Sequence, residues 1–237
     1  MSLSICPLSS DEIITISMAS IPERDEGMLA TVKTLLPYCD NFDLCLNNYT
    51  RKHYALLDDP KITVLRTPEE VGARGKFYLT HRTPGYHITI DDDIEYPLNY
   101  VHRMMQGIER YGRRAIVGFH GKTFTYNPES HILYNYTAKM HQDTPVHMIG
   151  TGTMGWHGDL MSLPWYDMLP GKVDDQVAGY AQDMGIPMIV LAHDNNWMAD
   201  RPDISLTCSL RRNMWARTES HARVIRRDWR FFTCART

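Results

Sequence analysis

The sequence predicts an α/β fold built on a mostly parallel sheet. Over the first 120 residues, short runs rich in Ile, Val and Leu alternate with segments whose apolar residues recur at helical spacing. This alternation of strand and helix is typical of a parallel sheet with helices on its faces. The chain has 237 residues, 43% of them hydrophobic, which is enough for a single domain with a sizeable core.

The elements of the first part follow one another without long gaps. Five apolar runs bounded by Gly, Pro or Asp predict strands, and three stretches with helical spacing predict helices. In chain order, the strands are residues 12–19, 42–47, 61–66, 86–90 and 114–120, and the helices are residues 28–39, 75–82 and 98–112.

After residue 120 the pattern changes. Residues 123–140 hold a polar turn between two aromatic-rich stretches, which predicts a hairpin or lid. The glycine-rich residues 150–160 are interpreted as a flexible loop, either one that contacts an acceptor or a turn that binds no ligand. A helix over 173–185 and a last buried strand over 186–197 follow.

Composition excludes several classes of protein. The net charge of −3 argues against a general nucleic-acid binder. The five cysteines are scattered and form no C-x-x-C pair, which argues against a disulfide framework or a zinc-thiolate site. No stretch approaches the roughly 20 apolar residues of a membrane span, and no signal peptide is evident, so we expect a cytoplasmic protein.

Three consecutive aspartates, Asp91, Asp92 and Asp93, follow the predicted strand at 86–90. Parallel sheets bind ligands beyond the carboxyl ends of their strands, and alternate residues of an extended segment point the same way. Asp91 and Asp93 are therefore candidates to bind one Mn²⁺ or Mg²⁺ ion, while Asp92 orients a neighbour. The alternative interpretation is a solvated acidic turn.

The residues around this triplet extend the pattern. Gly72, Ala73 and Arg74 precede the predicted helix at 75–82, and Gly85 and Ile88 lead into the aspartates. In this order, the segment resembles the GT-A glycosyltransferases, family 2 in particular. The resemblance covers about residues 13–120 and departs from the family where Gly-Lys stands in place of the usual Asn after the Arg.

The resemblance implies one GT-A-type domain, with a nucleotide-sugar-binding half over about 13–120, an acceptor-binding and catalytic half over about 121–204, and a basic tail over about 205–237. It also implies transfer from a nucleotide-diphosphate sugar, UDP-sugar favoured, to a hydroxyl of a glycan or lipid-linked acceptor in polysaccharide or glycan synthesis. The implied donor-binding residues are Ala19, Ser20, Ile21, Pro22, Arg24, Arg74, Asp91 and Asp92. Lys76, at the departure from the family pattern, is a further candidate for a phosphate contact, and the alternative is a surface lysine.

Other candidates lie in the second half of the chain. Asp174 and Asp175 open the predicted helix at 173–185, and the resemblance implies that one of them, Asp175 preferred, is the general base of an inverting reaction. Helix capping and dipole compensation explain the same pair equally well. His193 lies toward the end of the segment predicted as the last strand and is a candidate third metal ligand, and the alternative interpretation is a histidine with a structural hydrogen-bonding role. Trp156 is a candidate to stack on an acceptor sugar.

The tail from about residue 205 is rich in Arg with interleaved Trp and Phe. This pattern suits peripheral contact with an anionic membrane surface, where a lipid-linked acceptor would lie, and it equally suits a solvated helix face. Two further hypotheses remain open for the whole chain. One is a sugar nucleotidyltransferase, although the Gly-rich loop usual after its first strand is absent, and the other is a non-catalytic carbohydrate-binding domain.

Overall fold

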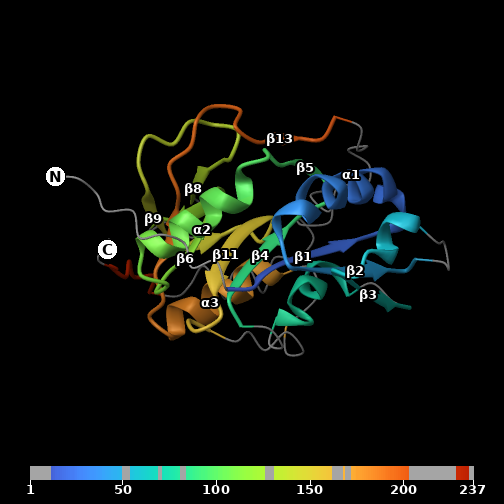
Figure 1. Cartoon of the computed structure of the whole chain (residues 1–237). Coiled ribbons are helices and arrows are strands. Elements are labelled where there is room, and N and C mark those ends of the chain that lie inside the picture. The colour runs from blue at the N-terminus through green and yellow to red at the C-terminus, as the bar shows by residue number, and fades with distance from the viewer. Residues whose placement is uncertain are drawn as a thin grey trace.

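The structure is a computed structural model that describes residues 12–49, 54–68, 71–80, 84–125, 131–161, 168, 172–202 and 228–234. A central sheet runs through the molecule and helices cover both of its faces (Figure 1). The strands of this sheet are β1 (Ile14–Ser20), β2 (Asn41–Asn47), β3 (Ile62–Thr67), β4 (Tyr86–Ile90), β6 (Ile116–Gly118), β9 (Thr144–Val146), β11 (Thr153–His157) and β12 (Met188–Val190).

The eight strands lie in the order β3-β2-β1-β4-β11-β6-β12-β9. The first four are mutually parallel, β11 is antiparallel to both β4 and β6, and β9 is antiparallel to β12. The sheet is therefore mixed and mostly parallel. Strands from both halves of the chain share it, which places the predicted donor half and acceptor half on one framework.

Smaller elements complete the architecture. One small sheet joins β10, β7 and β8, and another joins β13 to β5. The remaining elements are β5 (Ile94–Glu95), β7 (Gly121–Phe124), β8 (His131–Tyr134), β10 (Met148–Ile149), β13 (Ala199–Asp200), α1 (Asp25–Leu35), α2 (Tyr100–Arg110), α3 (Val173–Asp183) and the 3-10 helices η1 (Pro22–Arg24), η2 (Leu36–Tyr38), η3 (Ala55–Asp58) and η4 (Gly72–Phe77).

Two hydrophobic cores lie on opposite faces of the sheet. Helices α1 and α2 pack on one face, and α3 and η4 pack on the other. The alternation of side chains along the strands divides them between the cores: Val117 and Ile189 face α2, whereas Ile116 and Met188 face α3. Burial on both faces explains why these strands read as continuous apolar runs rather than alternating ones.

The predicted strands and long helices of the first half are confirmed, with shifts at their ends. Helix α1 begins at Asp25 rather than residue 28, because Asp25 and Glu26 occupy its first turn, where acids stabilise the helix dipole. The helix predicted over 75–82 is instead η4, which begins at Gly72 and ends at Phe77. Gly72 has φ +63°, a backbone conformation that suits glycine at such a tight start.

The glycine-rich stretch at 150–160 is a correction. We expected a flexible loop, but residues 153–157 form β11, a central strand with every residue buried. Its glycine serves close packing, because a Cβ at Gly155 would lie 2.7 Å from Cγ of Met104 on α2. Only Gly150, Thr151 and Gly152 remain as a turn before the strand.

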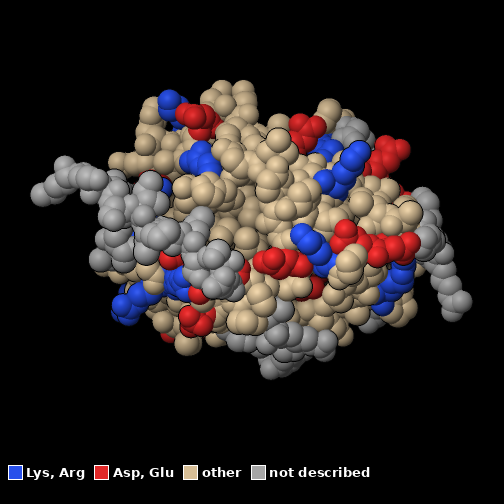
Figure 2. All heavy atoms as spheres, in the orientation of Figure 1, with Lys and Arg blue, Asp and Glu red and all other residues tan. Residues whose placement is uncertain are grey.

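The predicted hairpin is confirmed, because β7 pairs with β8 in antiparallel register. The tail from 205 falls mainly outside the described residues. Residues 228–234 are described, and there Trp229 packs against Phe124 and His147. No helix of the described part of the chain is long and apolar enough to cross a membrane. Acidic and basic side chains lie interspersed on the face shown in Figure 2.

The topology marks one place on the sheet. The chain adds β2 and β3 on one side of β1 and then crosses to add β4 on the other side. The boundary between β1 and β4 is therefore the topological switch point, where open α/β sheets form a crevice beyond their carboxyl ends. The aspartate triplet follows β4 at this boundary.

Candidate functional site

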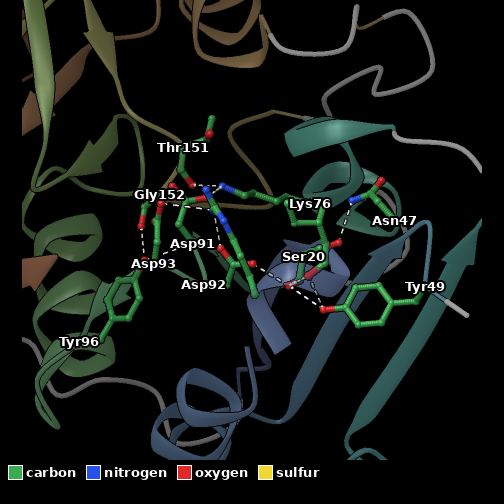
Figure 3. Close-up of polar contacts among 12 residues, drawn as sticks. Ser20, Asn47, Tyr49, Lys76, Asp91, Asp92, Asp93, Tyr96, Thr151 and Gly152 are labelled. Atoms are coloured by element: carbon green, nitrogen blue, oxygen red, sulfur yellow. Dashed lines mark hydrogen bonds and ion pairs between the residues drawn. The ribbon is translucent and has the colours of Figure 1, made fainter. Parts of the chain in front are cut away.

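The register between β1 and β4 sets the geometry of the triplet. Met18 pairs with Ile90, so Ser20 at the end of β1 lies level with Asp92. Figure 3 shows the resulting cluster of polar side chains at the carboxyl ends of the two strands. The three aspartates enter three different environments.

Asp92 points into the protein and is 2% exposed. Its carboxylate accepts hydrogen bonds from Ser20 Oγ at 2.6 Å and from an Nη of Arg24 at 2.8 Å. Burial raises the pKa of Asp92, and the Arg24 cation and the Ser20 hydrogen bond oppose that rise. Asp92 therefore fixes the loop after β1, which is an orienting role rather than a ligand's.

Asp91 is held from three sides. The ammonium of Lys76, itself buried, donates to Oδ1 of Asp91, and the hydroxyl of Tyr96 accepts from its backbone N–H at 2.8 Å. The same Tyr96 hydroxyl donates to the carbonyl of Gly152 at 2.7 Å. A Cβ at Gly152 would lie 2.2 Å from Oδ2 of Asp91, so the carboxylate lies directly against this glycine. The side chain of Asp91 remains 36% exposed.

Asp93 has the weakest hold on its surroundings. Its carboxylate lies 3.3 Å from an Nη of Arg24, and 37% of the side chain is exposed. Burial raises the pKa of Asp93 to about 6, the Asp91 carboxylate adds to the rise, and Arg24 opposes it. Its backbone carbonyl accepts from the N–H of Arg201 at 2.9 Å, which ties the triplet to the segment near β13.

The carboxylates of Asp91 and Asp93 fit a divalent cation that takes only one or two protein ligands. No three His, Cys, Asp or Glu side chains in the described ranges are grouped to hold a metal ion. Mg²⁺ commonly uses one or two protein carboxylates and completes its shell with water and substrate phosphates. Asp91 and Asp93, each partly exposed, fit a metal that arrives with a phosphorylated substrate.

The turn at 150–152 connects the triplet to α3. The carbonyl of Thr151 accepts from the Lys76 ammonium at 3.3 Å, and its N–H donates to Oδ1 of Asp174 at 2.9 Å. Thr151 therefore links Asp174 to Lys76, the cation that holds Asp91. The sequence separates these residues by more than 80 positions, and the fold brings them to one edge of the sheet. Asp175 lies beside it, half-buried, on the first turn of α3.

The loop after β1 is held by hydrogen bonds from the end of β2 and from the residues just beyond it. Asn47 Nδ2 donates to the carbonyl of Ser20 at 3.2 Å, and the hydroxyl of Tyr49 donates to the carbonyl of Ile21 at 2.8 Å. Ala19, Ile21 and Pro22 are half-buried at the same strand end. The predicted nucleoside-binding loop therefore lies beside the triplet and has a fixed backbone.

Arg74 lies on η4 but makes its described hydrogen bond away from the aspartates. Its guanidinium donates to the carbonyl of Met168 at 2.9 Å. Of the two basic residues predicted in this segment, Lys76 is the one that contacts the triplet.

His193 lies in a structural environment. It is 3% exposed, its Nδ1 is 2.8 Å from the carbonyl oxygen of Leu191, and its Nε2 is 3.4 Å from that of Asn135. Both ring nitrogens therefore face backbone oxygens. The structure groups no third His, Cys, Asp or Glu with Asp91 and Asp93 in the described ranges, so it does not bring His193 to the triplet as a ligand.

Trp156 is also placed in the core. It is 1% exposed on β11, and its ring stacks with His87 at 5.1 Å and with Phe77 at 6.0 Å between centroids. No face of the indole is open to a sugar, which corrects the expectation that this residue stacks on an acceptor. The aromatic side chain fills the space between the sheet and η4.

Sequence reasoning missed several residues of the site, namely Asn47, Tyr49, Tyr96, Thr151 and Gly152. Asn47, Tyr49 and Tyr96 act through side-chain hydrogen bonds to backbone groups of distant segments, and Thr151 and Gly152 act through their backbone or by close approach. The residue types alone do not indicate these partners. The one available signal was the position of Gly-Thr-Gly immediately before an apolar run, a pattern that is common in turns without ligands.

Comparisons with known proteins provide little more. No protein-family model matches the chain, and no curated protein matches it. Among solved structures, the fold is similar to a nucleotidyl transferase from Methanothermobacter thermautotroptrophicus, with 12% identity and a TM-score of 0.47. The match covers 76% of this chain and 86% of that chain. A likeness this distant assigns no activity and no residue to this protein.

Proposed function

We propose that this protein is a transferase that binds a nucleotide-diphosphate sugar with Mn²⁺ or Mg²⁺ and moves the sugar to an acceptor hydroxyl, on a GT-A-type fold. The carrying observation is the placement of the triplet. Two partly exposed carboxylates, Asp91 and Asp93, lie at the topological switch point beside a fixed loop, with Arg24 and Lys76 as neighbouring cations.

The protein groups divide the work of binding the donor. The loop of Ala19, Ser20, Ile21 and Pro22 offers the nucleoside a backbone held by Asn47, and Arg24 and Lys76 offer cations to the phosphates. Fixed cations at such a site need no reorganisation when negative charge develops on a departing diphosphate.

Asp91 and Asp93 would hold the divalent ion. When bound, the ion supplies electrostatic stabilisation of the leaving diphosphate. A solvated acidic turn, the alternative interpretation of the triplet, requires neither the buried Arg24–Asp92 pair nor the buried Lys76 beneath Asp91.

The general base is proposed to be one of the two acids at the start of α3. Asp174 is linked through Thr151 to the residues that hold Asp91, and Asp175 is the residue that the family resemblance favours. A carboxylate at this position can accept the acceptor's hydroxyl proton while the diphosphate leaves, which would invert the anomeric carbon. The acceptor is proposed to be a glycan or a lipid-linked sugar.

Nucleotidyl transfer is the second candidate. The observation that favours it is the presence of two buried cations beside the carboxylates, a combination that also suits a nucleoside triphosphate with its metal ion. The two reactions differ in the bond that breaks, and therefore in whether a nucleoside diphosphate or pyrophosphate is released.

A panel of nucleotide sugars tests the proposal. We expect one of them to stabilise the protein against thermal unfolding in Mn²⁺ but much less in EDTA, by about 2.7 kcal/mol at 100 times its dissociation constant. Release of free nucleoside diphosphate with an acceptor supports glycosyl transfer, and pyrophosphate exchange supports the second candidate. Stabilisation by no nucleotide under either condition would refute both.

Two pairs of variants locate the activity. Asp93→Asn should abolish the Mn²⁺-dependent stabilisation, whereas Asp159→Asn, the same change at a side chain that is 82% exposed, should leave it intact. Asp174→Asn and Asp175→Asn are compared for turnover: loss of the base should lower kcat by about 10²- to 10⁴-fold with donor affinity retained. A product that keeps the donor's anomeric configuration, read by NMR, would exclude the single displacement.

A further inference from the structure

We infer that Lys76 is a built-in counterion that occupies Asp91 in the free protein and exchanges it for a phosphate when the nucleotide arrives. Metal and nucleotide would then bind as a pair, and the metal alone would bind weakly. This inference rests on the proposed function and concerns the order in which its site is filled.

The first observation is the burial of the ammonium. The Lys76 side chain is 1% exposed, and its Nζ donates to Asp91 Oδ1 and to the carbonyl of Thr151. A buried ammonium without an anionic partner is energetically costly, because it has lost its hydration and no opposite charge compensates for that loss. If Asp91 turned to a metal ion alone, Lys76 would be left in that state.

The second observation is that the backbone on both sides of Lys76 is closely packed at the site. A Cβ at the preceding Gly75 would lie 2.5 Å from Sγ of Cys45, so the backbone of η4 is pressed against β2. The following residue, Phe77, is fully buried and stacks on Trp156. With the backbone fixed on both sides, the flexible part is the ammonium end of the side chain, which Figure 3 shows extended toward Asp91 and Thr151.

The third observation is the constraint on Asp91. The Tyr96 hydroxyl accepts from the backbone N–H of Asp91, and Gly152 lies against its Oδ2. The carboxylate therefore has little freedom to move away from Lys76 in order to bind a metal ion. A divalent ion at Asp91 would therefore lie close to the ammonium and be repelled by it. A phosphate resolves the conflict, because it gives Lys76 a new acceptor and gives the metal further oxygen ligands.

The expected consequence is a coupling between two ligands, which is reciprocal by thermodynamic necessity. Removing the ammonium should have opposite effects on them. The Lys76→Met variant keeps the volume of the side chain and should bind Mn²⁺ alone about tenfold more tightly or better, within the roughly 5- to 150-fold range of such couplings. The same variant should bind UDP in EDTA more weakly than wild type does, because the phosphate loses a cation.

The experiment measures both affinities on the full chain. Free Mn²⁺ is followed by electron paramagnetic resonance in the absence of nucleotide, and UDP binding in EDTA is followed by calorimetry. Lys139→Met is the matched control, since it removes the same charge from a side chain that is 52% exposed and pairs with Asp194 on the surface. The control should match wild type in both measurements.

Opposite shifts in Lys76→Met support the inference, and a variant that merely folds poorly would weaken both affinities. A Mn²⁺ affinity that does not rise, or a UDP affinity in EDTA that does not fall, would overturn it. Failure of the proposed function looks different: wild type then binds no nucleotide even with Mn²⁺ present, whereas the Mn²⁺ comparison between wild type and Lys76→Met still reports on the counterion.

Discussion

Gly152→Ala tests the closest contact in the site. The added Cβ would lie 2.2 Å from Oδ2 of Asp91, about 1.2 Å short of the 3.4 Å at which ordinary van der Waals contact begins. The backbone at this glycine needs no positive φ, so the strain is the contact itself and not the conformation. The carboxylate must retreat by about that distance or carry the turn with it.

The displacement has two measurable effects. A misplacement of about 1 Å at a reacting site costs on the order of 10²-fold in turnover, and we expect a loss of that size for Gly152→Ala in kcat/KM with the nucleotide sugar identified by the panel. Overpacking of this kind lowers the free energy of unfolding by about 1–3 kcal/mol, which urea denaturation resolves.

A matched substitution lies six residues along the same segment. At Gly158 the added Cβ would meet the carbonyl oxygen of Gly85 and Nε2 of His87 at 3.4 Å, which is ordinary contact. Gly158→Ala should therefore keep both activity and stability close to wild type. If Gly152→Ala behaved like Gly158→Ala in both assays, Asp91 would not be held where the structure places it. That result would also contradict the proposal that Asp91 is fixed beside Lys76.

Three further outcomes are expected from buried groups. Trp156→Ala should lower the free energy of unfolding by about 3–5 kcal/mol in urea titrations, because it empties a stacked core position. Arg24→Met should lower the free energy of unfolding by about 3–5 kcal/mol at neutral pH, since it leaves Asp92 buried without its cation. The free energy of unfolding should also decrease as the solution is acidified, because of His147. Burial lowers the pKa of His147, and its Nδ1 accepts a hydrogen bond from the N–H of Phe124 at 3.0 Å. The unfolded residue titrates near 6.5, so the contribution of His147 is complete above about pH 6.5 and is lost as the pH falls toward the lowered folded pKa.

Each of these has its own control. Trp156→Phe should recover part of the lost stability, and an unchanged stability with weakened acceptor binding would instead restore a sugar-stacking role. Arg66→Met removes an exposed arginine and should cost little, so an equal loss in both arginine variants would contradict the buried-pair argument. His147→Asn keeps an acceptor close to Nδ1 but cannot titrate, and an acid limb as steep as that of wild type would remove His147 as its origin.

Much of the fold follows from local pattern. The strand at residues 86–90 is confirmed at both ends, because a fully buried apolar run bounded by Gly85 and the aspartates leaves little choice of structure. The α/β class follows from the alternation of such runs with amphipathic helices, and α2 and α3 are found where the spacing predicts them. The triplet at a strand end is likewise a property of the sequence.

What the sequence misjudged depends on contacts between distant segments. The stretch containing Gly155 and Trp156 has loop-like composition, yet it forms a central strand because Met104 of α2 packs where a side chain would otherwise lie. His193 lies just beyond β12, which ends at Val190, but its ring nitrogens face backbone oxygens that only folding places beside it.

The sequence by itself determined that a parallel sheet carries three aspartates at the end of one strand. Only the tertiary structure decided what each aspartate does. Asp92 faces Ser20 because β1 and β4 pair in one register, and Asp91 meets Lys76 because η4 is pressed against the end of β2. The physical reason is that local propensity acts between near neighbours in the chain, whereas register and close packing join residues that are tens of positions apart.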